Sequence, residues 1–68
     1  MKMKIAVKML GVDEPIKVEG ELAHRLLAIF RATVAGNYDQ MVTVIDAVTN
    51  QRRFIRASHI TMITEEEE

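Results

Sequence analysis

The residues best suited to bind a ligand lie in the run Arg52-Arg53-Phe54-Ile55-Arg56, which holds three of the chain's five arginines. In an extended strand alternate side chains share a face, so Arg52, Phe54 and Arg56 lie together and Arg53 lies on the reverse. A guanidinium group can hold a phosphate through two parallel hydrogen bonds, and an aromatic ring can stack on a base. The spacing therefore predicts a binding surface for an anionic, nucleotide-like ligand.

Two further residues are expected to contribute to this site. Arg31 is a fourth anchoring cation, and His59, with Phe54, is a secondary contact. The alternative is that Phe54 belongs to the core, with the arginine stems packed beside it and their charged ends in water. The sequence leaves both interpretations open.

Residues that could support catalysis are few. Ser58 is the chain's one serine and is followed by His59, but neighbours in an extended segment point to opposite faces, and no third residue is placed to orient the pair. Asp46 interrupts an apolar strand pattern and is expected to be partly buried, paired with Arg53 or Arg56 across a hairpin. We therefore expect a protein that is not an enzyme.

The chain offers no recognisable site for a metal or a cofactor. Cysteine is absent, and His24 and His59 do not have zinc-ligand spacing. The three glycines, at 11, 20 and 36, are isolated and form no phosphate-binding loop. No metal and no cofactor are expected.

The run 53–60, in which one strand ends in a short bend before another, resembles the closing strands of Sm-like RNA-binding proteins. The chain departs from that family because it lacks the diagnostic glycine and places a hairpin before its helix. No RNA-contacting residue is carried over from this resemblance.

The N-terminal third predicts a β-hairpin over residues 2–18. Residues 2–9 alternate between apolar side chains and a second face that bears Lys2, Lys4 and Lys8, as in a half-buried strand. Turn-forming residues then occupy 11–15, and the alternation returns at 16–18.

The remaining elements predict an α+β fold in the order β-β-α-β-β-β. Apolar residues recur with helical spacing from Gly20 to residue 35, and Gly36 with Asn37 forms a strong stop. Strands follow at 41–48, 52–56 and 60–63, with a turn at 49–51 and a bend at Ser58-His59. We expect one antiparallel sheet with the amphipathic helix packed on one face.

Size and composition predict self-association. A chain of 68 residues buries only about 60% of its unfolded surface, and here disulfides cannot add stability. The outer helix face is rich in small side chains, although alanine is also the best helix former, and strand 41–48 is apolar on both faces. The expected homo-oligomer interface consists of His24, Ala28, Ala32, Ala35, Val42 and Val44.

The net charge of −1 hides an uneven distribution. Without the four glutamates at 65–68, nine basic residues face six acidic ones, a net charge of +3 over residues 1–64. We expect a single domain at 1–64 and a disordered acidic tail at 65–68. No apolar run reaches the length of a membrane span and no export signal is visible, so a cytoplasmic location is expected.

These features predict a small homo-oligomeric binding module that binds or sequesters an anionic ligand or inhibits a partner protein. One alternative is a nucleic-acid-binding protein that uses Lys2, Lys4 and Lys8 with the 52–56 arginines. Another is an assembly factor that binds only proteins, through the alanine-rich helix face or an open sheet edge.

Overall fold

A computed structural model describes residues 2–36 and 39–66 of the chain. In chain order its elements are β1 (Lys4–Met9), β2 (Ile16–Glu19), α1 (Glu21–Val34), β3 (Met41–Ile45), β4 (Arg52–Arg56), the 3-10 turn η1 (Ala57–His59) and β5 (Ile60–Glu66). This order confirms the α+β class and the β-β-α-β-β-β succession. The bend expected at Ser58-His59 is η1.

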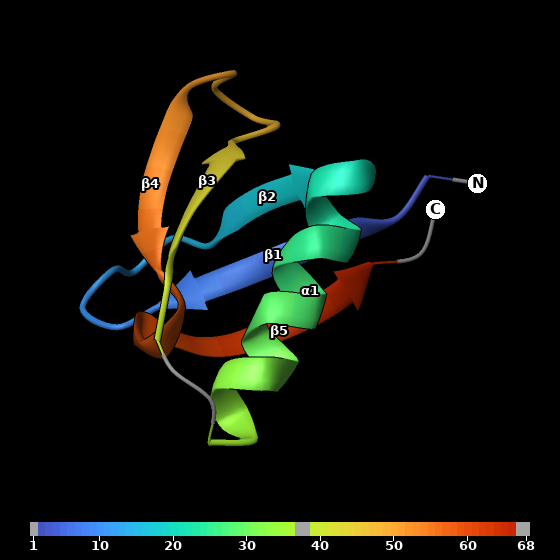
Figure 1. Ribbon diagram of the computed structural model, residues 1–68. Coiled ribbons are helices and arrows are strands. Elements are labelled where there is room, and N and C mark those ends of the chain that lie inside the picture. The colour runs from blue at the N-terminus through green and yellow to red at the C-terminus, as the bar shows by residue number, and fades with distance from the viewer. Residues whose placement is uncertain (1, 37–38, 67–68) are drawn as a thin grey trace.

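The strands form two antiparallel sheets instead of the single sheet expected. One sheet has the order β2-β1-β5, and the other is the β3–β4 hairpin. The strands divide into two sheets because η1 turns the chain after β4. Strand β5 therefore pairs with β1 and not with β4, from Met9↔Ile60 to Lys4↔Glu66. Figure 1 shows α1 on one face of the three-stranded sheet, with the hairpin beside the helix.

One core lies between the two sheets and the helix. Alternate residues of β1 and of β3 point into it, as period-two side-chain geometry requires, and α1 contributes its apolar stripe. The buried side chains are Ile5, Val7, Met9, Val18, Ala23, Leu26, Val42, Val44, Ile55 and Ile60. Both sheets therefore depend on the same set of apolar contacts.

The helix begins and ends where the sequence predicted. Gly20 is its N-cap, with φ 72° and ψ −141°, and its carbonyl accepts hydrogen bonds from the N–H groups of Ala23 and His24. This backbone conformation is essentially restricted to glycine. At the other end, Gly36 has φ 97° and donates its N–H to the Thr33 carbonyl, so the helical path stops there. Asn37 lies outside the described residues.

The assignment of Val42 and Val44 to an oligomer interface is wrong. Val44 is 0% exposed and Val42 is 6% exposed, because both pack in the core of their own chain. The other face of the strand, with Met41 and Ile45, is exposed in the single chain, so its coverage by a second subunit stays a prediction. The two faces were indistinguishable by hydrophobicity, and the pairing with β4 decided which one turns inward.

Two residues of the expected acidic tail belong to a strand. Glu65 and Glu66 belong to β5, opposite Ile5 and Lys4. The Lys17 Nζ lies 2.7 Å from the Glu66 Oε2, so cationic neighbours stabilise an acidic strand end that looks disordered by composition alone. Residues 67–68 lie outside the described residues.

In the described part of the chain, no helix is both long enough and apolar enough to cross a membrane.

Candidate ligand-binding face of the β3–β4 hairpin

The outward side of the β3–β4 sheet carries a mixed apolar and cationic surface. Cross-strand pairs share a face of a sheet, and the observed register pairs Met41 with Arg56, Thr43 with Phe54, and Ile45 with Arg52. All six side chains are exposed. We call this set the hairpin face: Met41, Thr43, Ile45, Arg52, Phe54 and Arg56.

Phe54 lies at the centre of the hairpin face and is 69% exposed. The alternative in which Phe54 belongs to the core is therefore wrong. Ile55 takes the core position instead, opposite Val42, because consecutive residues of a strand point to opposite sides. An aromatic ring flanked on its own strand by Arg52 and Arg56 is thus presented to the outside of the molecule.

Arg53 is separated from the other two arginines of β4. It lies opposite Val44 on the inward side of the hairpin, and its Nη2 is 3.8 Å from the Oδ2 of Asp46. Asp46 is buried, as expected, and its Oδ1 also accepts a hydrogen bond from the Val48 N–H at 2.9 Å. Arg53 thus neutralises a buried carboxylate that shapes the hairpin turn, so it is not part of the hairpin face.

Arg53 also borders a groove of about 440 Å³ between the β1–β2 loop and the β3–β4 turn. The groove is lined by Val12, Glu14, Pro15, Ile16, Lys17, Asp46, Val48, Thr49 and Arg53. The lining contains two cations, Lys17 and Arg53, and two carboxylates, Glu14 and Asp46. Arg53 pairs with Asp46, and Lys17 pairs with Glu66 outside the lining. The charges in this groove are balanced, which gives an anion little net attraction.

Arg56 is joined to the segment before β3. Its Nη1 is 3.6 Å from the Oδ2 of Asp39, and that carboxylate also accepts hydrogen bonds from the Ser58 Oγ, the Ser58 N–H and the Gln40 N–H, at 2.8, 2.9 and 2.9 Å. Desolvation raises the pKa of Asp39, but these hydrogen bonds and the Arg56 charge outweigh it and hold the pKa below its ordinary value. Arg56 keeps an exposed side chain in this arrangement.

Arg52 differs from Arg56 in its surroundings. Among residues 2–36 and 39–66, no carboxylate oxygen lies within ion-pair distance of its guanidinium group. It stands on the hairpin face opposite Ile45, at the turn end of the hairpin. Its hydrogen-bond donors are therefore available to an external anion.

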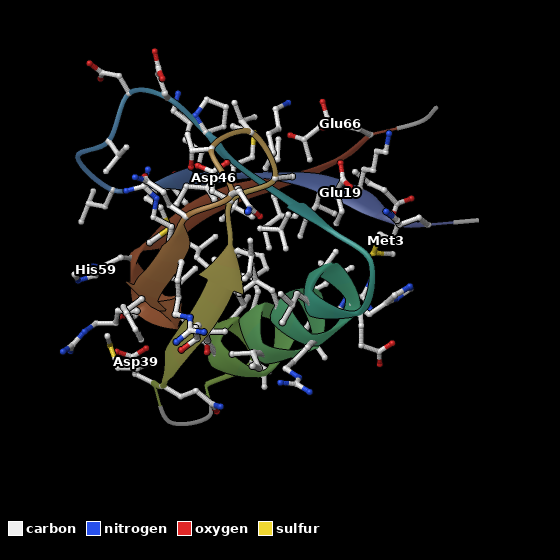
Figure 2. All side chains as sticks on the ribbon, turned by 90° about the horizontal axis from the view of Figure 1, so that it is seen from above. Met3, Glu19, Asp39, Asp46, His59 and Glu66 are labelled. Atoms are coloured by element: carbon white, nitrogen blue, oxygen red, sulfur yellow. The ribbon has the colours of Figure 1, made fainter. Side chains whose placement is uncertain are left out.

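The other two expected ligand residues lie on different elements. His59 is exposed in η1, and Arg31 is exposed in the last turn of α1. Figure 2 shows Asp39 and Asp46 at opposite ends of the hairpin and His59 pointing outward. Neither His59 nor Arg31 belongs to the hairpin face.

The helix residues expected at an oligomer interface lie at the surface of the single chain. His24, Ala28 and Ala35 are exposed, and Ala32 is half-buried. The structure describes one chain, so their role in self-association stays a prediction.

The N-terminal lysines lie on a different surface from the arginines. Lys4 and Lys8 are in β1, and Lys4 stands opposite Glu19 on one side and Glu66 on the other. The Lys2 Nζ is also 3.6 Å from the Glu19 Oε1. Acidic neighbours on the same sheet therefore reduce the positive potential around Lys2 and Lys4.

Sequence reasoning missed some members of the hairpin face. Met41, Thr43 and Ile45 were not among the expected site residues, nor was Asp39. The period-two pattern placed Met41 and Ile45 on one side of their strand, but only the register brought them opposite the arginines. Within the residues that the structure describes, no group of three or more His, Asp or Glu is arranged to hold a metal ion.

Comparison of the chain with protein family models, with curated proteins and with solved structures finds no match.

Proposed function

We propose that this protein is a non-enzymatic binding module whose hairpin face holds an anionic, nucleotide-like ligand. The observation that carries the proposal is the exposure of Phe54 between Arg52 and Arg56 on one sheet face. Exposed aromatic rings beside guanidinium groups are a recurring means of holding a base and its phosphate.

Each part of the hairpin face has a role in this proposal. The base stacks on the ring of Phe54, and the neighbouring Met41 and Ile45 add apolar contact at its edges. The phosphate binds the guanidinium group of Arg52 through two hydrogen bonds. Arg56 supplies a second positive charge while it remains beside Asp39.

The same composition also favours a second candidate function. Methionine, phenylalanine and arginine are enriched at protein–protein interfaces, and the hairpin face contains all three. In this alternative the module binds an apolar and acidic surface of a partner protein. Direct titration with nucleotides distinguishes the two functions, because only the first predicts that a free nucleotide binds the hairpin face.

The direct test is to titrate the protein with a panel of purine and pyrimidine nucleotides and to measure binding by isothermal titration calorimetry. We expect Arg52→Ala and Phe54→Ala each to weaken binding, and Arg25→Ala to leave it unchanged. Arg25 is a matched control because it is an exposed arginine on α1, away from the hairpin face. Binding that is unaffected by Arg52→Ala and Phe54→Ala would place the site elsewhere.

Self-association is proposed alongside ligand binding, through the outer face of α1. The support for it is the small size of the chain and the exposed His24, Ala28 and Ala35. Native mass spectrometry reports the number of subunits and any retained ligand in one measurement.

A further inference from the structure

We infer that the ligand of the hairpin face is a short stretch of single-stranded nucleic acid and not a free mononucleotide. This inference rests on the proposed function and names the class of ligand for the same site. It follows from the spacing of the two arginines, from the pairing of Arg56 and from the open shape of the face.

The spacing sets the length of the ligand. Arg52 and Arg56 are four residues apart in β4, which corresponds to about 13 Å at about 3.3 Å per residue, and Phe54 lies midway. A single nucleotide whose base stacks on Phe54 can extend its phosphate toward only one end of β4. The arginine at the other end then meets a phosphate only if the ligand continues as a chain.

The pairing of Arg56 opposes the alternative in which both arginines close on one phosphate. Its guanidinium group lies beside Asp39, at the end of the hairpin that is farther from Arg52. To reach a phosphate shared with Arg52, it would have to leave Asp39 and turn back along the strand. A polyanion can bind Arg52 and Arg56 at separate phosphates with this ion pair in place.

The shape of the face also favours a chain. Sites for small ligands are concave and bury most of the ligand, whereas the six side chains of the hairpin face are all exposed. An open surface gains affinity by repeating weak contacts along a strand, through base stacking and phosphate pairing. The bases must be unpaired to stack on Phe54, so the fit is to a single strand and not to a duplex.

Little sequence preference is expected. Apart from the arginines, Thr43 is the one polar side chain on the hairpin face, so few groups can read base edges. The lysines of β1 lie on the other sheet, where Lys4 stands between Glu19 and Glu66, and they are not needed. This separates the inference from a mode of nucleic-acid binding that depends on Lys2, Lys4 and Lys8.

The test measures the fluorescence anisotropy of a labelled oligothymidylate bound to the protein. Thymidine 5′-monophosphate and unlabelled oligothymidylates of increasing length are the competitors. We expect affinity to rise steeply from one to about three nucleotides and then to level off, because a chain of that length can place one phosphate at each arginine and a longer chain adds no further cation. The slope of log affinity against log salt should be about −1.4 for two phosphate contacts on a single strand.

Variants assign the contacts. Arg52→Ala and Arg56→Ala should each reduce the magnitude of the salt slope by about 0.7. Phe54→Ala should weaken binding roughly 5- to 150-fold and leave the slope unchanged, because stacking releases no counterions. Arg25→Ala should change neither quantity, and circular dichroism verifies that each variant is folded.

Three results would overturn the inference. If the monophosphate binds as tightly as the oligomers, the ligand is a mononucleotide and the proposed function survives. If a duplex or a polyglutamate of equal charge binds as well as the single strand, then the face recognises charge alone, as a partner protein with an acidic surface would require. If no nucleotide or oligomer binds at low salt, both the inference and the proposed function fail.

Discussion

The Arg56 Nη1 lies 3.6 Å from the Asp39 Oδ2, and this pair joins one end of the hairpin face to the segment before β3. Asp39 also accepts hydrogen bonds from Ser58, so one carboxylate connects this segment, β4 and η1. The conformation of an arginine of the hairpin face is thereby linked to the protonation state of an acid outside the hairpin.

Asp39 should make stability depend on pH in acid solution. Its pKa is lower in the folded protein, so its contribution is fully present above the unfolded pKa of about 3.9 and is lost as pH falls through the folded value. We expect Asp39→Asn to be less stable than the parent protein at neutral pH, and the difference to shrink below about pH 4. Urea denaturation between pH 2 and 7 measures both. A difference that does not change with pH would contradict this role.

Phe54 and Ile55 should respond very differently to truncation, although they are neighbours in β4. Ile55→Ala removes a buried core side chain and should lower the free energy of unfolding by about 2–4 kcal/mol. Phe54→Ala removes an exposed ring and should change it by less than about 0.5 kcal/mol. Chemical denaturation of both variants checks the assignment of the two faces. Equal losses would mean that Phe54 is buried in solution.

The hairpin turn requires a residue that accepts a left-handed conformation. Asn50 has φ 60°, and its N–H donates to the Asp46 carbonyl at 2.7 Å. We expect Asn50→Val to lower the free energy of unfolding by about 1–2 kcal/mol, because a β-branched side chain is strained at this φ. Asn50→Gly is the matched control and should be close to neutral. Thermal denaturation that ranks the two variants the other way would argue against this turn.

Asp46 combines two roles that substitutions can separate. Asp46→Asn keeps an oxygen that can accept the Val48 N–H but removes the charge beside Arg53, whereas Asp46→Ala removes both. We expect Asp46→Ala to lower the free energy of unfolding by about 1–3 kcal/mol and Asp46→Asn by less. If the two variants are equally destabilised, the loss comes from the charge and not from the hydrogen bond.

The helix face tests self-association. Ala28 is exposed on α1, so Ala28→Glu should leave the fold of the single chain intact and dissociate an oligomer that packs through this face. Native mass spectrometry of the parent protein and the variant gives the subunit number of each. Ala28→Ser is a control that keeps the side chain small. A monomeric parent protein would contradict the predicted homo-oligomer.

Local patterns were sufficient to predict the elements of this fold. The alternation in residues 2–9 and the helical spacing between Gly20 and Gly36 depend only on neighbours in the chain, and both predictions agree with the structure. The bend at Ser58-His59 also agrees with η1, but the strand predicted at 41–48 ends at Ile45, and the turn predicted at 49–51 begins earlier, at residues 47–49. The alternation of Arg52, Phe54 and Arg56 also followed from strand geometry alone.

Contacts between distant segments decided the rest. Strand 41–45 is apolar on both sides, so its inward face depended on pairing Val42 with Ile55 and on the core contributed by β1 and α1. Composition predicted that Glu65 and Glu66 belong to a disordered tail, but in the folded chain they pair with β1, and Lys17 pairs with Glu66. The amino-acid order determined which residues alternate along each strand. Only the tertiary structure determined which alternate set is buried, because burial is a property of the side chains that meet it from elsewhere in the chain.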